Sequence, residues 1–146
     1  MYTIDTSVWV NATEPHEIDH VASRTFLRES AGRTLPIILP TLLLVEVSAT
    51  IGRLRGEHRS ARITRLVAHW QATTFVDLNR MLTDSAAQLA RQHSLRGADA
   101  IYAAVALHYG TTLISRDREH LTRLQGFVPV LHPADALHVL QASPSS

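Results

Sequence analysis

The first five residues, MYTID (residues 1–5), form a short apolar run that ends at an acid. This pattern is typical of a buried strand that stops at a polar side chain. It recurs near the other end of the chain as TTLISRD (residues 111–117), where Asp117 lies just beyond the apolar run. The sequence predicts three further strands of the same apolar type, over residues 35–39, 73–76 and 127–131.

Segments with a helical period separate these strands. In residues 17–30, apolar side chains recur at Ile18, Val21, Ala22 and Phe26, which is the spacing of one helix face. Another helix follows Thr41, which we expect to cap it, and further helices are predicted over residues 60–70, 80–93, 98–108 and 134–140. Apolar strands that alternate with helices predict an α/β fold with a parallel sheet covered on both faces.

The length of 146 residues and the 45% of hydrophobic residues suit one domain with a sizeable core. We therefore expect a single-domain α/β/α sandwich over residues 1–141 and a disordered tail over residues 142–146. The longest apolar run, residues 35–45, holds two prolines and is about half of a ~20-residue membrane span. No lysine or arginine precedes Arg24, so we expect no signal peptide. These features predict a cytoplasmic protein with no membrane partner.

The composition excludes several kinds of chemistry. The chain has no cysteine, which rules out disulfides, thiolate zinc sites and cysteine nucleophiles. All 14 of its cationic side chains are arginine, and the missing lysine excludes a P-loop nucleotide site and Schiff-base catalysis. The formal net charge is only +1, so any positive surface must arise from local clustering of arginines.

Four acids occupy positions where a ligand site is expected. In a parallel sheet, ligands bind outside the carboxyl ends of the strands, and Asp5 and Asp117 each follow a predicted strand. Glu46 interrupts the apolar helix LLLVEVSATI, and Asp99 falls in the first turn of the helix in LRGADAIYAA. Each has a purely structural alternative: a helix cap for the acids after strands, a dipole interaction for Asp99, and an ion pair with an arginine for Glu46.

Taken together, the four acids indicate a metal site. Clustered carboxylates repel each other, and Mg²⁺ or Mn²⁺ prefers oxygen ligands that leave room for water and substrate phosphate. Such an ion can activate a water and stabilise a phosphoryl transition state. Zinc is less expected, because none of the nine histidines shows a paired spacing such as HExxH.

Several neighbours of the acids are candidates for supporting roles. Ser7 either orients a water or an acid, or caps the helix after Asp5, and Ser115 either positions Asp117 or ends its strand. Two arginines lie beside the acids, Arg96 and Arg116. They either hold a scissile phosphate or neutralise the charge of the acidic cluster. His120 can serve as an acid near neutral pH, although we expect a surface histidine at this position.

One stretch of the chain is locally basic. Five arginines share it with a single acid, Glu57. It is either a solvated helix surface or a contact for RNA phosphates or for the carboxylates of a protein partner. The five arginines are Arg53, Arg55, Arg59, Arg62 and Arg65.

The acidic segments resemble the successive motifs of PIN-domain ribonucleases. They are IDTSVWVN, LLLVEVSATI, LRGADAIYAAVA and TTLISRDREH. The length and the arginine-rich stretch are similar to those of VapC-type toxins. The resemblance implies a five-stranded parallel sheet and a Mg²⁺- or Mn²⁺-dependent endoribonuclease that is inhibited by a small cognate antitoxin and is usually dimeric. It places the family's acids on Asp5, Glu46, Asp99 and Asp117 and its small hydroxyl residue on Ser7. Some relatives carry a further acid soon after the fourth, in the neighbourhood where this chain has His120.

Two other functions remain open at this stage. The first is a non-catalytic PIN-like binding module that keeps the acids as an ion-stabilised scaffold. The second is a metal-dependent nuclease that acts on single-stranded DNA.

Overall fold

A computed structural model describes residues 1–142 and forms five strands and eight helices within them. Residues 143–146 of the predicted tail lie outside the described part, and Ala142 is the last residue of a helix rather than the first of a tail. The strands are β1 (Tyr2–Ile4), β2 (Ile37–Pro40), β3 (Thr73–Val76), β4 (Thr112–Ile114) and β5 (Val130–Leu131). The helices are α1 (Thr6–Asn11), α2 (His20–Gly32), α3 (Leu42–Arg55), α4 (Glu57–Ala68), α5 (Arg80–His93), α6 (Gly97–Tyr109), α7 (Arg118–Arg123) and α8 (Pro133–Ala142).

The strands form one parallel sheet in the order β3-β2-β1-β4-β5. This confirms the predicted five-stranded sheet and the α/β class. The central strands β1 and β4 pair with Ile4 opposite Ile114. The chain runs from β1 outward to β2 and β3, then returns to place β4 and β5 on the other side of β1. The strand order therefore reverses at β1, which is where open α/β sheets bind their ligands.

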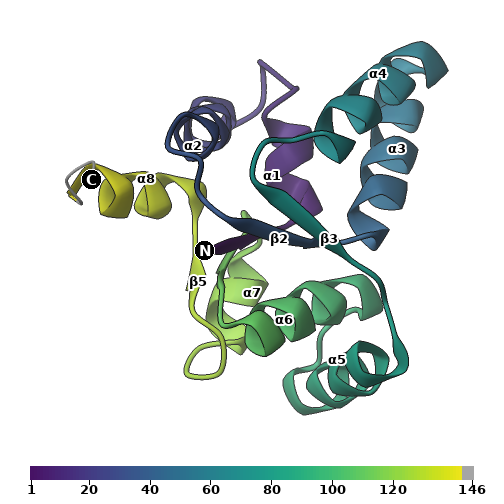
Figure 1. Ribbon diagram of the computed structural model, residues 1–146, viewed down its shortest axis with the longest axis vertical. Coiled ribbons are helices and arrows are strands. Elements are labelled where there is room, and N and C mark those ends of the chain that lie inside the picture. Colours follow the sequence, from purple (N-terminus) through teal and green to yellow (C-terminus); the bar gives the residue numbers. More distant parts are fainter. Residues whose placement is uncertain (143–146) are drawn as a thin grey trace.

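Helices cover both faces of the sheet (Figure 1). Helices α1, α2, α3 and α4 lie on one face, α5, α6 and α7 lie on the other, and α8 packs against α2. Strand residues such as Leu39 and Leu113 are fully buried, and they share one hydrophobic core with Val47 of α3. The alanine-rich helix α6 buries Ala103 and Ala104 completely, because small side chains let it lie close to the sheet. None of the helices in residues 1–142 is long and apolar enough to cross a membrane.

Three local predictions differ from the structure. Helix α2 begins at His20 rather than near residue 17, because Asp19 adopts a left-handed backbone (φ 68°); Ile18 is consequently 82% exposed outside the helix. Thr41 precedes α3 but its side chain makes no capping hydrogen bond. Strand β5 is shorter than predicted, because the amide of Phe127 closes a turn onto Leu124 instead of joining the sheet.

The helices α3 and α4 form a hairpin that carries the basic stretch. Gly56 joins them with a backbone φ of 83°, which glycine adopts without the steric penalty of a Cβ. Ser60 of α4 then donates a hydrogen bond to the carbonyl of Ser48 in α3 at 2.7 Å. The hairpin extends away from the sheet, and the start of α3, which follows β2, is its end nearest the sheet (Figure 1).

Candidate active site

Four elements bring the predicted acids to one edge of the sheet. Asp5 ends β1 and Asp117 follows the neighbouring strand β4, so both lie at the carboxyl edge where the strand order reverses. Helix α6 precedes β4, and its first turn carries Asp99 to the same edge. Helix α3 starts directly after β2 and carries Glu46 in its second turn. The fold thus gathers side chains that lie far apart in the sequence.

Asp5 is fixed by two hydrogen bonds from different segments. It is 6% exposed; its Oδ1 accepts from the Ser7 amide at 3.0 Å and its Oδ2 accepts from the Ser115 hydroxyl at 2.7 Å. Asp5 is thus the cap of α1. Capping the helix does not prevent the same carboxylate from facing the candidate site. Burial alone would raise the pKa of Asp5, but the His120 imidazole beside it and the hydrogen bonds from Ser7 and Ser115 hold it below its ordinary value.

The two serines hold the turns that carry the acids. Ser115 accepts a hydrogen bond from the Asp117 amide at 3.0 Å while its own proton is donated to Asp5. Ser7 accepts from the Arg116 amide at 3.3 Å. Each serine therefore ties the turn after β1 to the turn after β4, which fixes the distance between the two acidic segments.

His120 is not the surface residue that we expected. It is 1% exposed and is the buried residue of α7. Its Nδ1 lies 3.3 Å from Asp5 Oδ2 and its Nε2 lies 3.3 Å from Asp99 Oδ1. Burial alone would lower the pKa of His120, but the two carboxylates beside its ring nitrogens raise it to about 10. Without an ion, His120 is therefore the cation that neutralises part of the acidic cluster.

Among residues 1–142, Asp99, Asp117 and His120 form a group with the geometry of a metal site. One ligand atom of each lies within 4.8 Å of the others. Asp99 and Asp117 are partly exposed, while the Nε2 atom of His120 is buried and has no hydrogen-bond partner of acceptable geometry in residues 1–142. Two accessible carboxylates beside an unpartnered imidazole nitrogen fit a divalent cation.

Glu46 joins the site through a hydroxyl network. Its Oε2 accepts from Thr6 Oγ1 at 2.7 Å and from the Tyr102 hydroxyl at 2.6 Å. Tyr102 is 1% exposed, and burial together with the negative charge of Glu46 raises its pKa far above the ordinary value, so it stays a donor. The described residues place no arginine in an ion pair with Glu46, so this structural alternative does not apply.

The sequence analysis did not single out Tyr102 and Thr6, although the positions of both in the sequence could have indicated a role at the site. Tyr102 lies about one helical turn after Asp99 in an otherwise alanine-rich segment, so it occupies the same face of α6. Thr6 directly follows Asp5. A hydroxyl side chain is a candidate hydrogen-bond donor to the acids of a site when it shares a helix face with one of them or follows one in the sequence.

The family model described as PIN domain matches residues 2–126. The chain belongs to the PIN domain family. The match spans β1 to the end of α7 and therefore contains all four predicted acids.

Solved structures of other PIN domains share its fold. VapC20 of Mycobacterium tuberculosis, a sarcin–ricin loop cleaving toxin, is 18% identical with a TM-score of 0.71, over 88% of this chain and 97% of that one. FitAcB from Neisseria gonorrhoeae is 18% identical with a TM-score of 0.70, over 91% and 98%. VapBC2 from Rickettsia felis, bound to a DNA fragment from its promoter, is 15% identical with a TM-score of 0.68, over 90% and 97%. No functionally curated protein matches the sequence.

The two arginines beside the acids of this PIN domain differ in availability. Arg116 donates to the Ile18 carbonyl at 2.9 Å, and its guanidinium lies 3.5 Å from Glu17 and 3.7 Å from Asp19. It thus neutralises the segment before α2 rather than the four acids. The side chain of Arg96, next to α6, is exposed and has no hydrogen bond or ion pair with any residue from 1 to 142.

The five arginines of the basic stretch also differ in availability: two are held by contacts within the PIN domain, and three are exposed. Arg55 forms an ion pair with the buried Glu14, with Nε 3.1 Å from Oε2. Arg59 donates to the Thr13 carbonyl at 3.1 Å. Both therefore fix the segment that follows α1. The other three arginines are exposed: Arg53, Arg62 and Arg65. Within residues 1–142, their only hydrogen bond to another side chain is donated by Arg53 to Thr50.

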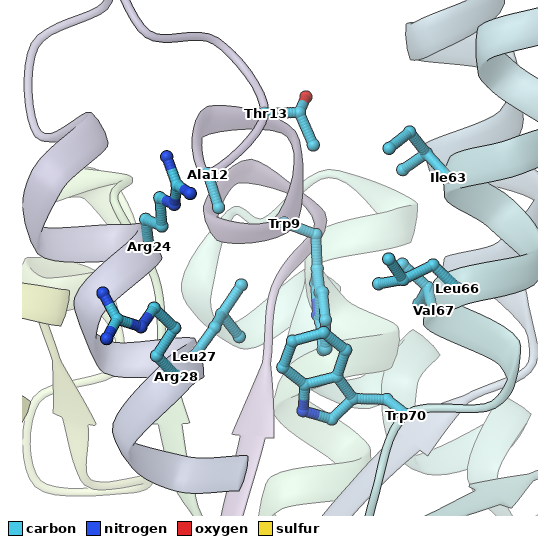
Figure 2. A pocket seen from close by; sticks show the side chains of 10 residues that line it. All are labelled: Trp9, Ala12, Thr13, Arg24, Leu27, Arg28, Ile63, Leu66, Val67 and Trp70. Carbon is cyan, nitrogen blue, oxygen red and sulfur yellow. The ribbon is translucent and has the colours of Figure 1, made fainter. Parts of the chain in front are cut away.

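A separate groove of about 250 Å³ lies between α2 and α4, with α1 behind it (Figure 2). Trp9 and Trp70 meet edge to face in it, with ring centroids 5.1 Å apart. Both indole nitrogens are buried without an acceptor among the described residues. Arg24 and Arg28 of α2 line the opposite side. The groove is therefore apolar, with positive charge at one wall and two unused hydrogen-bond donors.

Proposed function

We propose that this PIN domain is a Mg²⁺- or Mn²⁺-dependent endoribonuclease and the toxin of a toxin–antitoxin pair. The observation that carries the proposal is the convergence of Asp99, Asp117 and His120 around one point beside the fixed carboxylate of Asp5. The likeness of the fold to structures of VapC and VapBC proteins supports the same proposal.

The four acids have different proposed roles in binding the ion. Asp99 and Asp117 are partly exposed and would bind it directly, and Asp5 and Glu46 complete the acidic set proposed as ligands. A divalent ion held there would supply stabilisation of phosphate charge and activation of a water. Ser7 and Ser115 would keep Asp5 and Asp117 in position, and the hydroxyls of Thr6 and Tyr102 would keep Glu46 oriented. The side chain of Arg96 is free to hold a substrate phosphate.

The test is cleavage of an RNA oligonucleotide and of the single-stranded DNA of the same sequence, each in Mn²⁺. We expect endonucleolytic products from RNA only. Products from DNA alone would replace the proposal with a DNA nuclease. Binding without products from either would leave the non-catalytic binding module. Because the RNA target is unknown, total cellular RNA with mapped cleavage ends is the second substrate.

The free arginines of the α3–α4 hairpin are proposed RNA contacts. An acidic site repels RNA, so a nearby positive surface is needed to bind phosphate. Arg53 lies about 10 Å along α3 from Glu46, at 1.5 Å per residue. The exposed Arg62 and Arg65 extend this surface on α4. Arg55 and Arg59 are excluded as primary contacts because their side chains hold the segment after α1.

Replacing Arg62 and Arg65 with Gln is expected to weaken RNA binding almost equally for all sequences. The slope of log affinity against log salt should flatten by about 0.7 for each phosphate of single-stranded RNA that the variant no longer binds. The matched control replaces Arg80 and Arg91, which are also exposed but lie on α5, and should leave the slope unchanged. Equal slopes in both variants would exclude the hairpin as the RNA surface.

The groove between α2 and α4 is the proposed docking surface of the antitoxin. Structures with the same fold include a toxin–antitoxin complex from Klebsiella pneumoniae. The apolar wall, the unused indole donors and the guanidinium groups of Arg24 and Arg28 suit a peptide that presents apolar side chains, carbonyls and carboxylates. Because the chain has two tryptophans and both line the groove, docking of an antitoxin there is measurable as a change in intrinsic fluorescence.

We further propose that residues 1–141 act as one nuclease domain, as a homodimer in the cytoplasm. The fold continues without interruption from β1 to α8, which supports a single domain. Dimerisation and location are carried over from the resemblance to VapC-type toxins. Sedimentation of the purified chain tests the dimer directly.

A further inference from the structure

His120 presents a free imidazole nitrogen to the acidic cluster. Its Nε2 atom is buried and has no hydrogen-bond partner within residues 1–142, and it lies 3.3 Å from Asp99 Oδ1. Buried polar atoms in folded proteins are nearly always partnered. The side chain itself is 1% exposed, so water cannot serve freely as its partner. An unpartnered nitrogen that faces carboxylates is the arrangement of a ligand that lacks its ion.

The hydrogen bonds on the other side of the ring determine which nitrogen carries the lone pair. The single hydroxyl proton of Ser115 is donated to Asp5 Oδ2 at 2.7 Å. Ser115 Oγ lies 2.9 Å from His120 Nδ1, so Nδ1 must be the donor in that hydrogen bond. Because Nδ1 keeps its proton, binding of a metal ion releases the Nε2 proton of the cation to solvent and leaves a neutral imidazole with its lone pair on Nε2, towards Asp99. Histidine ligands of metals commonly use their second nitrogen in this way, as a donor to a fixed acceptor.

The distance between Nε2 and Asp99 Oδ1 also suits a shared ion. Two ligand atoms each about 2.1 Å from one ion lie about 3.0 Å apart at a right angle and about 3.4 Å apart at the tetrahedral angle. The observed 3.3 Å falls within that range. A ligand atom of Asp117 lies within 4.8 Å of the other two, which is close to the ~4.2 Å that separates two ligands on opposite sides of one ion.

The geometry points to a mixed nitrogen–oxygen site, in which His120 Nε2 joins the carboxylates of Asp99 and Asp117 as a ligand of one divalent transition-metal ion. The inference rests on the proposed function for its carboxylate ligands and adds the imidazole to them. First-row transition metals accept imidazole readily, whereas Mg²⁺ is bound mainly by carboxylates and water. The site should therefore prefer Mn²⁺ to Mg²⁺.

A different role for His120 makes the opposite prediction. If the imidazole is only a counter-charge between Asp5 and Asp99, it competes with the metal ion for those carboxylates. Its removal would then increase the local negative charge and strengthen the binding of Mn²⁺ and of Mg²⁺ alike. If it is a ligand, its removal weakens Mn²⁺ binding selectively.

Calorimetric titration of the EDTA-treated full chain with Mn²⁺ and with Mg²⁺ separates the two roles. His120→Asn is the informative variant, because the amide nitrogen can replace Nδ1 as donor while nothing replaces Nε2. We expect the Mn²⁺ affinity to fall by about tenfold or more and the Mg²⁺ affinity to change much less. His138→Asn, at an exposed histidine of α8, should leave both affinities unchanged. Unchanged or tighter Mn²⁺ binding in His120→Asn would overturn the inference.

A second measurement needs no variant and so does not depend on folding of His120→Asn. Pulsed electron paramagnetic resonance of the Mn²⁺-loaded parent chain detects a directly coordinated ¹⁴N nucleus. We expect that coupling, and its absence would also overturn the inference. Neither readout involves RNA. A chain that binds Mn²⁺ through nitrogen but cleaves no RNA would refute the proposed function alone, and a chain that cleaves RNA without the coupling would refute this inference alone.

Discussion

Asp5→Asn is expected to lower the rate of RNA cleavage by several orders of magnitude. The substitution keeps the size of the side chain and the cap of α1, since Asn accepts from the Ser7 amide as Asp does. It removes the negative charge beside His120 and one of the carboxylates proposed to serve the ion. The measurement is the single-turnover cleavage rate at saturating Mn²⁺. A variant that cleaves RNA as fast as the parent would refute the assignment of the site.

The same variant should also be less stable in the absence of metal. From the clustered acids alone, removing one charge would relieve repulsion and raise the free energy of unfolding. The structure reverses this expectation, because His120 lies between Asp5 and Asp99 as a buried cation. Removing Asp5 takes one of the two carboxylate partners from this buried cation and leaves it with Asp99, so we expect a loss of about 2 kcal/mol.

The dependence of this loss on pH follows from the two pKa shifts. The pKa of Asp5 is lowered on folding, so its contribution is present above its ordinary value of 3.8 and is lost as the pH falls. The pKa of His120 is raised from 6.5 to about 10, so its contribution is present below 6.5 and is lost as the pH rises towards 10. The difference in stability between parent and variant should be largest between pH 3.8 and pH 6.5. Denaturant unfolding at about pH 5.5 and about pH 9.5, with chelator present, measures it.

Asp84→Asn is the matched control for both measurements. Asp84 also pairs with a cation, Arg80, but this pair lies on the surface of α5. Exposed pairs contribute little to stability, so the control should retain the parent's unfolding free energy and its cleavage rate. An equal loss of stability in the two variants would contradict the role assigned to His120.

Removing divalent ions with EDTA is expected to abolish cleavage, and adding Mn²⁺ or Mg²⁺ in excess should restore it. Clustered carboxylates repel a transition-state phosphate unless a divalent ion neutralises their charge. Ca²⁺ should bind but support little turnover, because it takes more ligands in a looser geometry. Cleavage is followed with the same RNA oligonucleotide in each ion.

Two controls make the metal result interpretable. Circular dichroism in EDTA should show an intact fold, because His120 supplies a positive charge to the cluster in the absence of an ion. Cleavage of the RNA by Asp5→Asn in Mn²⁺ measures any contaminating nuclease. Full activity of the parent in excess EDTA would exclude the metal mechanism, whatever the substrate.

Much of the fold could be predicted because its signals are local. The apolar segment before Asp5 and the periodicity around Val47 and Ile51 depend only on neighbouring residues, and both elements formed as predicted. Predictions were less accurate where the backbone leaves the regular pattern. The left-handed conformation of Asp19 delayed the start of α2 and left Ile18 exposed, because hydrophobic periodicity does not report a break in the helix.

By itself the sequence determined the acids and the edge at which they would meet. Asp5 and Asp117 follow apolar strands, and in a parallel sheet the ends of such strands face the same side. Only the tertiary structure decided which other side chains join them. The partners of His120, Tyr102 and Arg116 lie tens of residues away along the chain or on another element. Their identity depends on how helices pack across the sheet, and that packing is not encoded by the periodicity of any single segment.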